Sequence, residues 1–320
     1  MFEYTRNNHV QCNYTNDQDF YFKHGTVSSH KSWREECKLS AQEIYDKNGD
    51  NLILLFSGGL DSEVMLHSFL ASGITPKVVL FRYERNLNLH DLNYAFKLCA
   101  ARQISPIVIN INVEDFYKTE LLNFAKQSTC SSPQLNLYYY HANKLDGIPV
   151  FGAGENYLIR QPGHVQVYDC EEARVTSIYK YFKSIDRECI PSFFQYTPET
   201  MISYLQNENI YKWVETAKIN RYINTKKIKG TIIAEDFDIE PRPKLTGFEL
   251  MMDLDNEYRK KLLNMKLGDE GEQLIPFEQY ITMFGVDLLR DIQYKLSLIH
   301  ISEPTRPERI GDAGVGVEKK

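Results

Sequence analysis

The sequence predicts an α/β fold in which a parallel sheet carries helices on both faces and an α-helical C-terminal region follows. Apolar runs without alternation, such as residues 52–56 and 78–81, are typical of strands buried on both faces. After the first run, Val64, Met65 and Phe69 recur at helical spacing. Strands that alternate with helices in this way favour parallel pairing.

The elements can be placed in order along the chain. A helix is expected at residues 29–48, after a hairpin or wrapping arm at 1–28. The strands are expected at residues 51–56, 76–83, 106–113 and 148–151, and the helices between them at 63–70, 91–103, 114–127 and 131–145. From about residue 170 the pattern changes to helices and irregular segments. The expected regions are an N-terminal arm and helix at 1–50, an α/β domain at 51–170, a mainly helical substrate or lid region at 171–296, and a disordered or non-native tail at 297–320.

The composition is that of a soluble globular protein, with 42% hydrophobic and 25% charged residues. A net charge of −6 at pH 7 argues against a protein that coats nucleic acid. The apolar runs are too short to span a bilayer, and the N-terminus lacks the pattern of a secretory signal. The 6 cysteines are scattered without a Cys-x-x-Cys pair, so neither a zinc knuckle nor a disulfide framework is indicated. We expect a cytoplasmic protein without a membrane partner.

The segment Ser57-Gly-Gly-Leu-Asp-Ser62 lies between the first strand and its helix. Its glycines allow a tight turn that brings backbone N–H groups together, and its serine hydroxyls add donors beside a helix N-terminus. Such a turn is a cradle for phosphates, and the acid Asp61 inside it requires a metal ion to accompany them. The alternative is an ordinary strand-turn-helix. A Walker P-loop is excluded because no Gly-Lys-Ser or Gly-Lys-Thr is present.

This hexapeptide resembles the PP-loop signature of the ATP pyrophosphatase superfamily, also called adenine nucleotide alpha-hydrolase-like, and is nearest in motif to asparagine and NAD synthetases. The resemblance covers about residues 50–170. It implies that ATP is cleaved between its α- and β-phosphates and that AMP activates a substrate oxygen. It also implies Mg²⁺ as cofactor, held by Asp61. The cradle residues that it assigns to ATP are Ser57, Gly58, Gly59, Leu60, Asp61 and Ser62.

Two further strand ends belong to the same predicted site, because ligands of parallel sheets bind beyond the strand carboxyl ends. At residues 81–83, which include Phe81 and Arg82, relatives hold the adenine by backbone contacts. Residues 151–157 resemble the second nucleotide loop of asparagine and NAD synthetases. There Gly152 and Gly154 allow close backbone approach, and Glu155 is the candidate for a second magnesium contact. This loop departs from the asparagine synthetase form at Ala153 and Asn156.

Other relatives carry cysteine patterns that this sequence lacks. The deazaguanine synthases have a clustered-cysteine zinc site, and many tRNA thiolases use Cys-x-x-Cys. A Cys at position 2, the N-terminal nucleophile of glutamine-hydrolysing synthetases, is also missing. Nitrogen transfer would therefore need ammonia from a partner, or an amine that reacts directly.

Two cationic segments follow the α/β domain. The run Lys218, Arg221, Lys226, Lys227 and Lys229 has the pattern of a solvated helix face or of a surface for tRNA or a phosphorylated substrate. The segment 240–249 contains two prolines that stiffen the chain around Arg242 and Lys244. By analogy with the mobile-loop lysine of related synthetases, Arg242 or Lys244 is predicted to stabilise departing pyrophosphate. The alternative is an interdomain linker with surface cations.

The function predicted from the sequence is a PP-loop ligase that adenylates an oxygen of a small molecule for attack by a nitrogen nucleophile. The alternatives are a tRNA-modifying PP-loop enzyme of the thiolase or lysidine type, and a regulator that binds the nucleotide without turnover.

Overall fold

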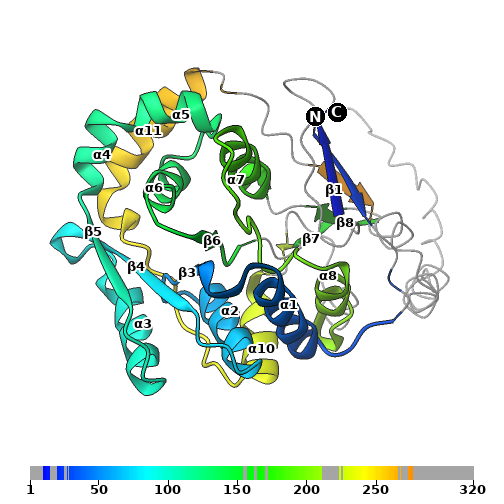
Figure 1. The fold of residues 1–320 in the computed structure, drawn as a ribbon. Coiled ribbons are helices and arrows are strands. Elements are labelled where there is room, and N and C mark those ends of the chain that lie inside the picture. The colour runs from blue at the N-terminus through cyan, green and yellow to red at the C-terminus, as the bar shows by residue number, and fades with distance from the viewer. Residues whose placement is uncertain are drawn as a thin grey trace, which may run out of the picture.

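The computed structural model describes residues 10–14, 20–24, 27, 29–153, 157–161, 164–169, 172–210, 223–224, 226–265, 267 and 273–276. Its central element is a parallel sheet with the strand order β5-β4-β3-β6. These strands are β3 (Leu52–Leu55), β4 (Lys77–Tyr83), β5 (Ile107–Ile111) and β6 (Ile148–Val150). The predicted parallel α/β sheet is confirmed (Figure 1).

Helices cover both faces of this sheet (Figure 1). One face packs against α1 (Trp33–Asn48), α2 (Leu60–Ala71), α8 (Pro198–Leu205) and α10 (Lys226–Phe237). The other packs against α4 (Val113–Thr119), α5 (Leu121–Ser128), α6 (Pro133–Ala142), α7 (Glu172–Ser184) and α11 (Met252–Asn264).

Successive residues of the central strand show why the apolar run does not alternate with polar residues. Leu52 and Leu54 belong to one buried cluster, whereas Ile53 and Leu55 belong to the other. Because successive side chains of a strand point to opposite faces, a strand between two helical layers must be apolar at every position.

Several elements differ from the sequence expectation. The single helix expected at 114–127 is divided at Glu120, which ends α4 and precedes α5. The helix α3 (Leu89–Ala101) begins two residues before its expected start. Between β4 and α3 lies the short 3₁₀ helix η2 (Glu84–Asn86), and the others are η1 (Gly49–Asn51) and η3 (Phe248–Met251).

A second, antiparallel sheet was not anticipated from the sequence. Its strand order is β10-β8-β7-β9, with β7 (Tyr157–Gln161), β8 (His164–Asp169), β9 (Ile223–Asn224) and β10 (Gln273–Pro276). Two of these strands fall within the region expected to be mainly helical. Strands β1 (Val10–Tyr14) and β2 (Phe20–His24) form a hairpin, one of the two forms expected for the N-terminal arm. The tail at 297–320 lies outside the described residues.

None of the helices in the described ranges combines the length and the apolar character needed to cross a membrane.

Candidate functional site

The cradle is closed by its two serines. Gly59 precedes the first residue of α2, so the loop opens directly onto the helix N-terminus. The hydroxyls of Ser57 and Ser62 lie 3.0 Å apart, and Ser62 Oγ donates to the Gly59 carbonyl at 2.9 Å. The Ser57 N–H in turn donates to Ser62 Oγ at 3.2 Å. These bonds hold the six residues in a compact loop. The N-terminus of α2, which is the positive end of the helix dipole, faces this loop.

Gly58 fits this loop because it has no side chain. Its φ is +82°, and a Cβ at this position would lie 1.9 Å from the backbone oxygen of Asp91 in α3. The loop therefore rests directly on the first turn of α3. A residue with a side chain would strain the backbone and separate the two elements.

Gly152 performs a similar task on the other side of the loop. A Cβ there would lie 3.1 Å from the Cα of Ser62, so the strand end after β6 contacts the start of α2. The two predicted loops are thus brought together at Gly152. Gly154 and Glu155, the remaining candidates of the second loop, lie outside the described residues.

The end of β4 is the third predicted contact with ATP. The backbone oxygen of Phe81 accepts a hydrogen bond from Asn88 Nδ2 at 2.8 Å, and the Tyr83 N–H donates to Asn88 Oδ1 at 2.9 Å. The side chain of Arg82 is exposed. The backbone groups predicted to hold adenine are therefore engaged by a side chain of the same protein.

The C-terminal part of the chain delivers a lysine to the cradle. Lys229 on α10 places its Nζ 2.7 Å from Asp61 Oδ1, and the two side chains are only 14% and 23% exposed. A solvated helix face is therefore the wrong interpretation for Lys229. A surface for tRNA along the run 218–229 stays a prediction. The side chains of Lys226 and Lys227, and Lys218 and Arg221 as a whole, lie outside the described part of the structure.

A second cation reaches the same loop from the segment 240–247, which we call the strap. Arg242 donates to the Gly58 carbonyl at 2.7 Å, pairs with the Glu63 carboxylate, and lies 4.2 Å from the centre of the Tyr94 ring. Its side chain is 10% exposed. Lys244, the alternative candidate, is exposed.

The strap is also attached to the turn before α3. The N–H of Leu245 donates to Asp91 Oδ1 at 3.1 Å. A Cβ on Gly247, whose φ is +90°, would lie 2.6 Å from the backbone of Leu87. The strap thus runs from the cradle to the turn before α3 and contacts both.

Burial sets the protonation of two groups beside β4. Burial raises the pKa of Tyr138 to about 12, and the charge of Asp91 adds to this, while hydrogen bonds with Tyr83 and Ser57 act in the opposite direction. Burial also lowers the pKa of His141 to about 4, with a smaller contribution from Lys144. His141, whose ring centre lies 5.9 Å from that of Phe81, is therefore neutral near pH 7.

The residues at the cradle suit a metal ion that is shared with phosphates. Asp61 supplies one carboxylate beside two serine hydroxyls, and Mg²⁺ usually takes one or two carboxylates together with substrate oxygens. Among the residues that the structure describes, no group of three or more His, Cys, Asp or Glu side chains could hold a metal by itself.

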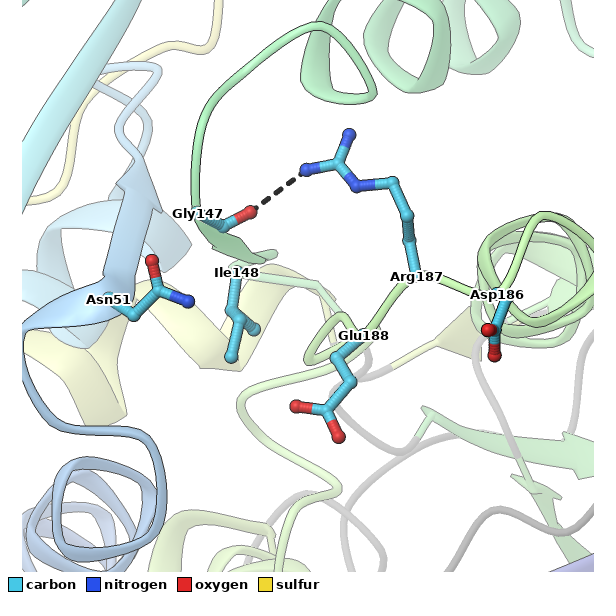
Figure 2. A pocket seen from close by; sticks show the side chains of 6 residues that line it. All are labelled: Asn51, Gly147, Ile148, Asp186, Arg187 and Glu188. Carbon is cyan, nitrogen blue, oxygen red and sulfur yellow. Dashed lines mark hydrogen bonds between the residues drawn. The ribbon is translucent and has the colours of Figure 1, made fainter.

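A pocket of about 290 Å³ lies at the opposite, amino-terminal end of the sheet (Figure 2). It is lined by Asn51, Gly147, Ile148, Asp186, Arg187 and Glu188. The guanidinium of Arg187 donates to the carbonyls of Leu145 at 2.8 Å and Gly147 at 3.0 Å, and also to Asn143. Arg187 therefore fixes the turn before β6.

Sequence reasoning missed Glu63 and Asn88 and gave Lys229 a different role. Glu63 follows the signature directly, which is a usable signal. Asn88 has the pattern of a helix N-cap, and nothing in the sequence indicates its contact with β4.

Comparison with known proteins finds a family model that matches the part of the chain containing the cradle. Residues 51–134 match the model of the family described as Queuosine biosynthesis protein QueC. A comparison with curated proteins finds no match.

Solved structures similar to this chain include three synthetases. NMN synthetase from Francisella tularensis aligns with a TM-score of 0.29 and 12% identity, covering 72% of this chain and 92% of that one. The NH3-dependent NAD synthetase from Campylobacter jejuni aligns with a TM-score of 0.30 and 16% identity, covering 77% and 100%. Glutamine-dependent NAD+ synthetase from Acinetobacter baumannii gives 0.31 and 13%, covering 80% and 51%.

The strand order of the central sheet, the signature loop at its carboxyl end and the family match agree with one another. Over residues 51–134 this chain is therefore similar to the QueC family, and it carries there the PP-loop signature of the ATP pyrophosphatase superfamily.

Proposed function

We propose that the protein is an AMP-forming ligase that uses ATP to adenylate an oxygen of a small molecule, which a nitrogen nucleophile then attacks. The observation that carries this proposal is the convergence of Lys229 and Arg242 on the cradle. Both come from the C-terminal part of the chain and pair with acids of the loop. A phosphate chain bound there would meet backbone N–H groups, hydroxyls and two cations.

In the proposed reaction, Ser57, Gly58, Gly59 and Ser62 hold the β- and γ-phosphates. A substrate oxygen forms a bond to the α-phosphorus, the bond from that phosphorus to the α,β-bridging oxygen breaks, and pyrophosphate leaves. The nitrogen nucleophile then attacks the activated carbon, loses its proton, and AMP departs with the oxygen. Lys229 and Arg242 neutralise the charge that develops on pyrophosphate.

Asp61, together with Glu155, is the proposed ligand set for Mg²⁺. When bound, the ion would neutralise the negative charge of the phosphates. Lys229 would leave Asp61 for the phosphates, because an ammonium and a divalent cation compete for one carboxylate.

The proposal leaves deazaguanine synthesis aside because the sequence lacks the clustered cysteines of those relatives. The proposed reaction needs a source of nitrogen, either a partner that supplies ammonia or an amine that reacts directly. A cytoplasmic location is consistent with the proposal. Modification of tRNA and nucleotide binding without turnover are outcomes of the test below.

The test is to incubate the protein with α-labelled ATP and Mg²⁺, either with a metabolite extract or with total tRNA, and to separate the labelled products. AMP and pyrophosphate that form only with the metabolite fraction support the ligase. AMP that forms only with tRNA supports tRNA modification instead. Stoichiometric binding without pyrophosphate release supports a regulator, and ADP as product contradicts PP-loop chemistry.

Variants of the cradle test the assignment of residues. Asp61→Asn and Lys229→Met should each reduce pyrophosphate release, and Lys126→Met, an exposed lysine on α5, is the matched control. Undiminished release by Asp61→Asn would refute the site.

A further inference from the structure

The carboxamide of Asn88 occupies two backbone groups at the end of β4. It donates to the Phe81 oxygen at 2.8 Å and accepts from the Tyr83 N–H at 2.9 Å. The side chain is 7% exposed. Strand β3, the neighbour of β4, ends at Leu55, opposite Val79. Beyond this point the Asn88 carboxamide makes the two hydrogen bonds to β4 that a residue of a neighbouring strand would make.

The order of donor and acceptor in this contact is that of one nucleobase edge. An amide presents N–H beside C=O, and adenine presents its exocyclic N–H beside the ring acceptor N1. Held in the same orientation as adenine, hypoxanthine and guanine present a carbonyl in place of the exocyclic N–H and a ring N–H in place of the acceptor N1. In this orientation the backbone pair at Phe81 and Tyr83 accepts an amide or adenine and rejects the other two purines, and phosphates held in the cradle would prevent the base from turning over.

This position adjoins the cradle. Asn88 is three residues before Asp91, whose backbone oxygen contacts Gly58. The strap also connects the two positions: Arg242 contacts Gly58 in the cradle, and Gly247 contacts the Leu87 backbone next to Asn88. A nucleotide with its phosphates in the cradle would bring its base to the end of β4.

Asn88 also occupies the N-cap position of α3, where an asparagine side chain can bond the first turn of a helix. It is the residue that precedes α3, yet its side chain makes no capping hydrogen bond there. Asparagine is among the best N-cap residues because its side-chain oxygen accepts from a backbone N–H of the first turn. If the carboxamide leaves β4, it can bond the start of α3 and does not become an unsatisfied polar group.

The turn that carries Asn88 is held in an uncommon conformation. Arg85 and Asn86 both have a φ of +56°, which is unusual for residues with side chains. Such conformations persist where the surrounding structure imposes them. The strap contacts the same turn at Leu87, so movement of the strap would change what holds Asn88 in place.

The geometry points to Asn88 as a specificity-determining residue that occupies the base position of the site and yields it to adenine. The inference rests on the proposed use of ATP. In the empty protein the carboxamide pairs with β4; when ATP binds, the adenine edge replaces it and the carboxamide turns to the N-terminus of α3. A base with the reverse order of donor and acceptor cannot make this exchange.

The experiment compares the full chain with Asn88→Ala by calorimetric titration with ATP and with ITP, whose base is hypoxanthine. Asn93→Ala, an exposed asparagine on α3, is the matched control. Removal of the competing amide should raise the affinity for ATP about tenfold, since two neutral hydrogen bonds no longer have to be exchanged. The affinity for ITP should stay unchanged.

The outcomes separate this inference from the proposed function. Equal ATP affinity of the wild type and a folded Asn88→Ala, or a weaker affinity of the variant, overturns the role of Asn88 alone. Failure of both chains to bind ATP overturns the proposed function and this inference with it. Binding of ATP only by the variant supports the inference in its strongest form.

A second measurement applies if Asn88→Ala does not fold. The side-chain amide resonances of Asn88 are followed in the ¹⁵N-labelled wild-type protein during titration with ATP. Resonances that move with ATP and stay in place with ITP support the exchange. Resonances that remain unchanged while ATP is bound contradict it.

Discussion

The two ends of the parallel sheet are built alike and differ in what their arginines contact. At the carboxyl end, Arg242 bonds the Gly58 carbonyl and pairs with the Glu63 carboxylate. At the amino end, Arg187 bonds the carbonyls of Leu145 and Gly147 and the Asn143 amide group. The guanidinium at the amino end donates its hydrogen bonds to residues 143–147, and it lies 5.9 Å from the centre of the Phe182 ring. At the carboxyl end the guanidinium pairs with a carboxylate, which a phosphate could replace as its partner.

The comparison shows how to separate a structural cation from a functional one. A guanidinium whose hydrogen bonds go to the carbonyls of one turn would leave several acceptors unsatisfied if it moved. A guanidinium paired with a carboxylate beside an anion cradle can exchange partners at a smaller cost, because an incoming phosphate replaces the carboxylate. The predictions below test this distinction.

The largest effect is expected from the glycines beside the two arginines. A Cβ on Gly58 would lie 1.9 Å from the Asp91 oxygen, and a Cβ on Gly147 would lie 2.6 Å from the Asn51 oxygen. Both have positive φ values, so Gly58→Ala and Gly147→Ala should each lower the free energy of unfolding by about 3 kcal/mol or more. Denaturant titration measures this, and nucleotide affinity should fall only in Gly58→Ala. Equal nucleotide affinity of the two variants would show that the ends are not functionally distinct.

The next effect concerns the lysine of the cradle. Lys229→Met should reduce the rate of pyrophosphate release about 100-fold, which corresponds to about 3 kcal/mol of lost transition-state stabilisation. Lys244→Met should have little effect, because Lys244 is exposed. Single-turnover kinetics with labelled ATP measure both rates. The reverse ranking would return the pyrophosphate role to Lys244.

The contiguous part of this site could be predicted from the sequence, and the rest depends on tertiary contacts. The six residues from Ser57 to Ser62 form one motif, so their cradle follows from local rules for a turn before a helix. Lys229 belongs to a run of cations that resembles a solvated helix face. Its contact with Asp61 depends on the packing of α10 against α2, which the sequence pattern does not reveal. Asn88 has the sequence pattern of a helix N-cap. Its hydrogen bonds to the backbone of β4 depend on where β3 ends, which is a tertiary feature.

The fold shows the same division. The parallel strands are apolar at nearly every position and could be located by that pattern. The antiparallel sheet could not, since β10 pairs Gln273 with Asp169, far away in the sequence. Its strands have 2 to 6 residues, too few to give a clear period of their own.

A smaller effect, on stability alone, is expected at the amino-terminal pocket. Arg187→Met should lower the free energy of unfolding by about 2 kcal/mol, because the carbonyls before β6 lose their donor. Its KM for ATP should match that of the wild type. A raised KM with unchanged stability would place Arg187 with the functional cations and remove the distinction between the two ends.

An effect of about the same size, which appears only at acid pH, originates at the carboxyl end. Burial lowers the pKa of His141 to about 4 from its ordinary 6.5. The unfolded chain therefore takes up a proton on this residue near pH 6.5, whereas the folded protein does so only near pH 4. The stability that the neutral imidazole contributes is complete above pH 6.5 and is lost as the pH falls from 6.5 to 4.

The loss should reach about 2 kcal/mol at the acid end of that window. A tenfold difference in proton affinity between the folded and unfolded chains corresponds to about 1.4 kcal/mol, and partial exposure of the ring reduces the full value. Denaturant titrations at several pH values on the wild type and on His141→Gln measure it. In the variant the difference in stability between pH 6.5 and 4 should shrink by this amount. An identical pH profile of the two proteins would mean that His141 titrates normally, and that the aromatic surroundings of Phe81 are open to water.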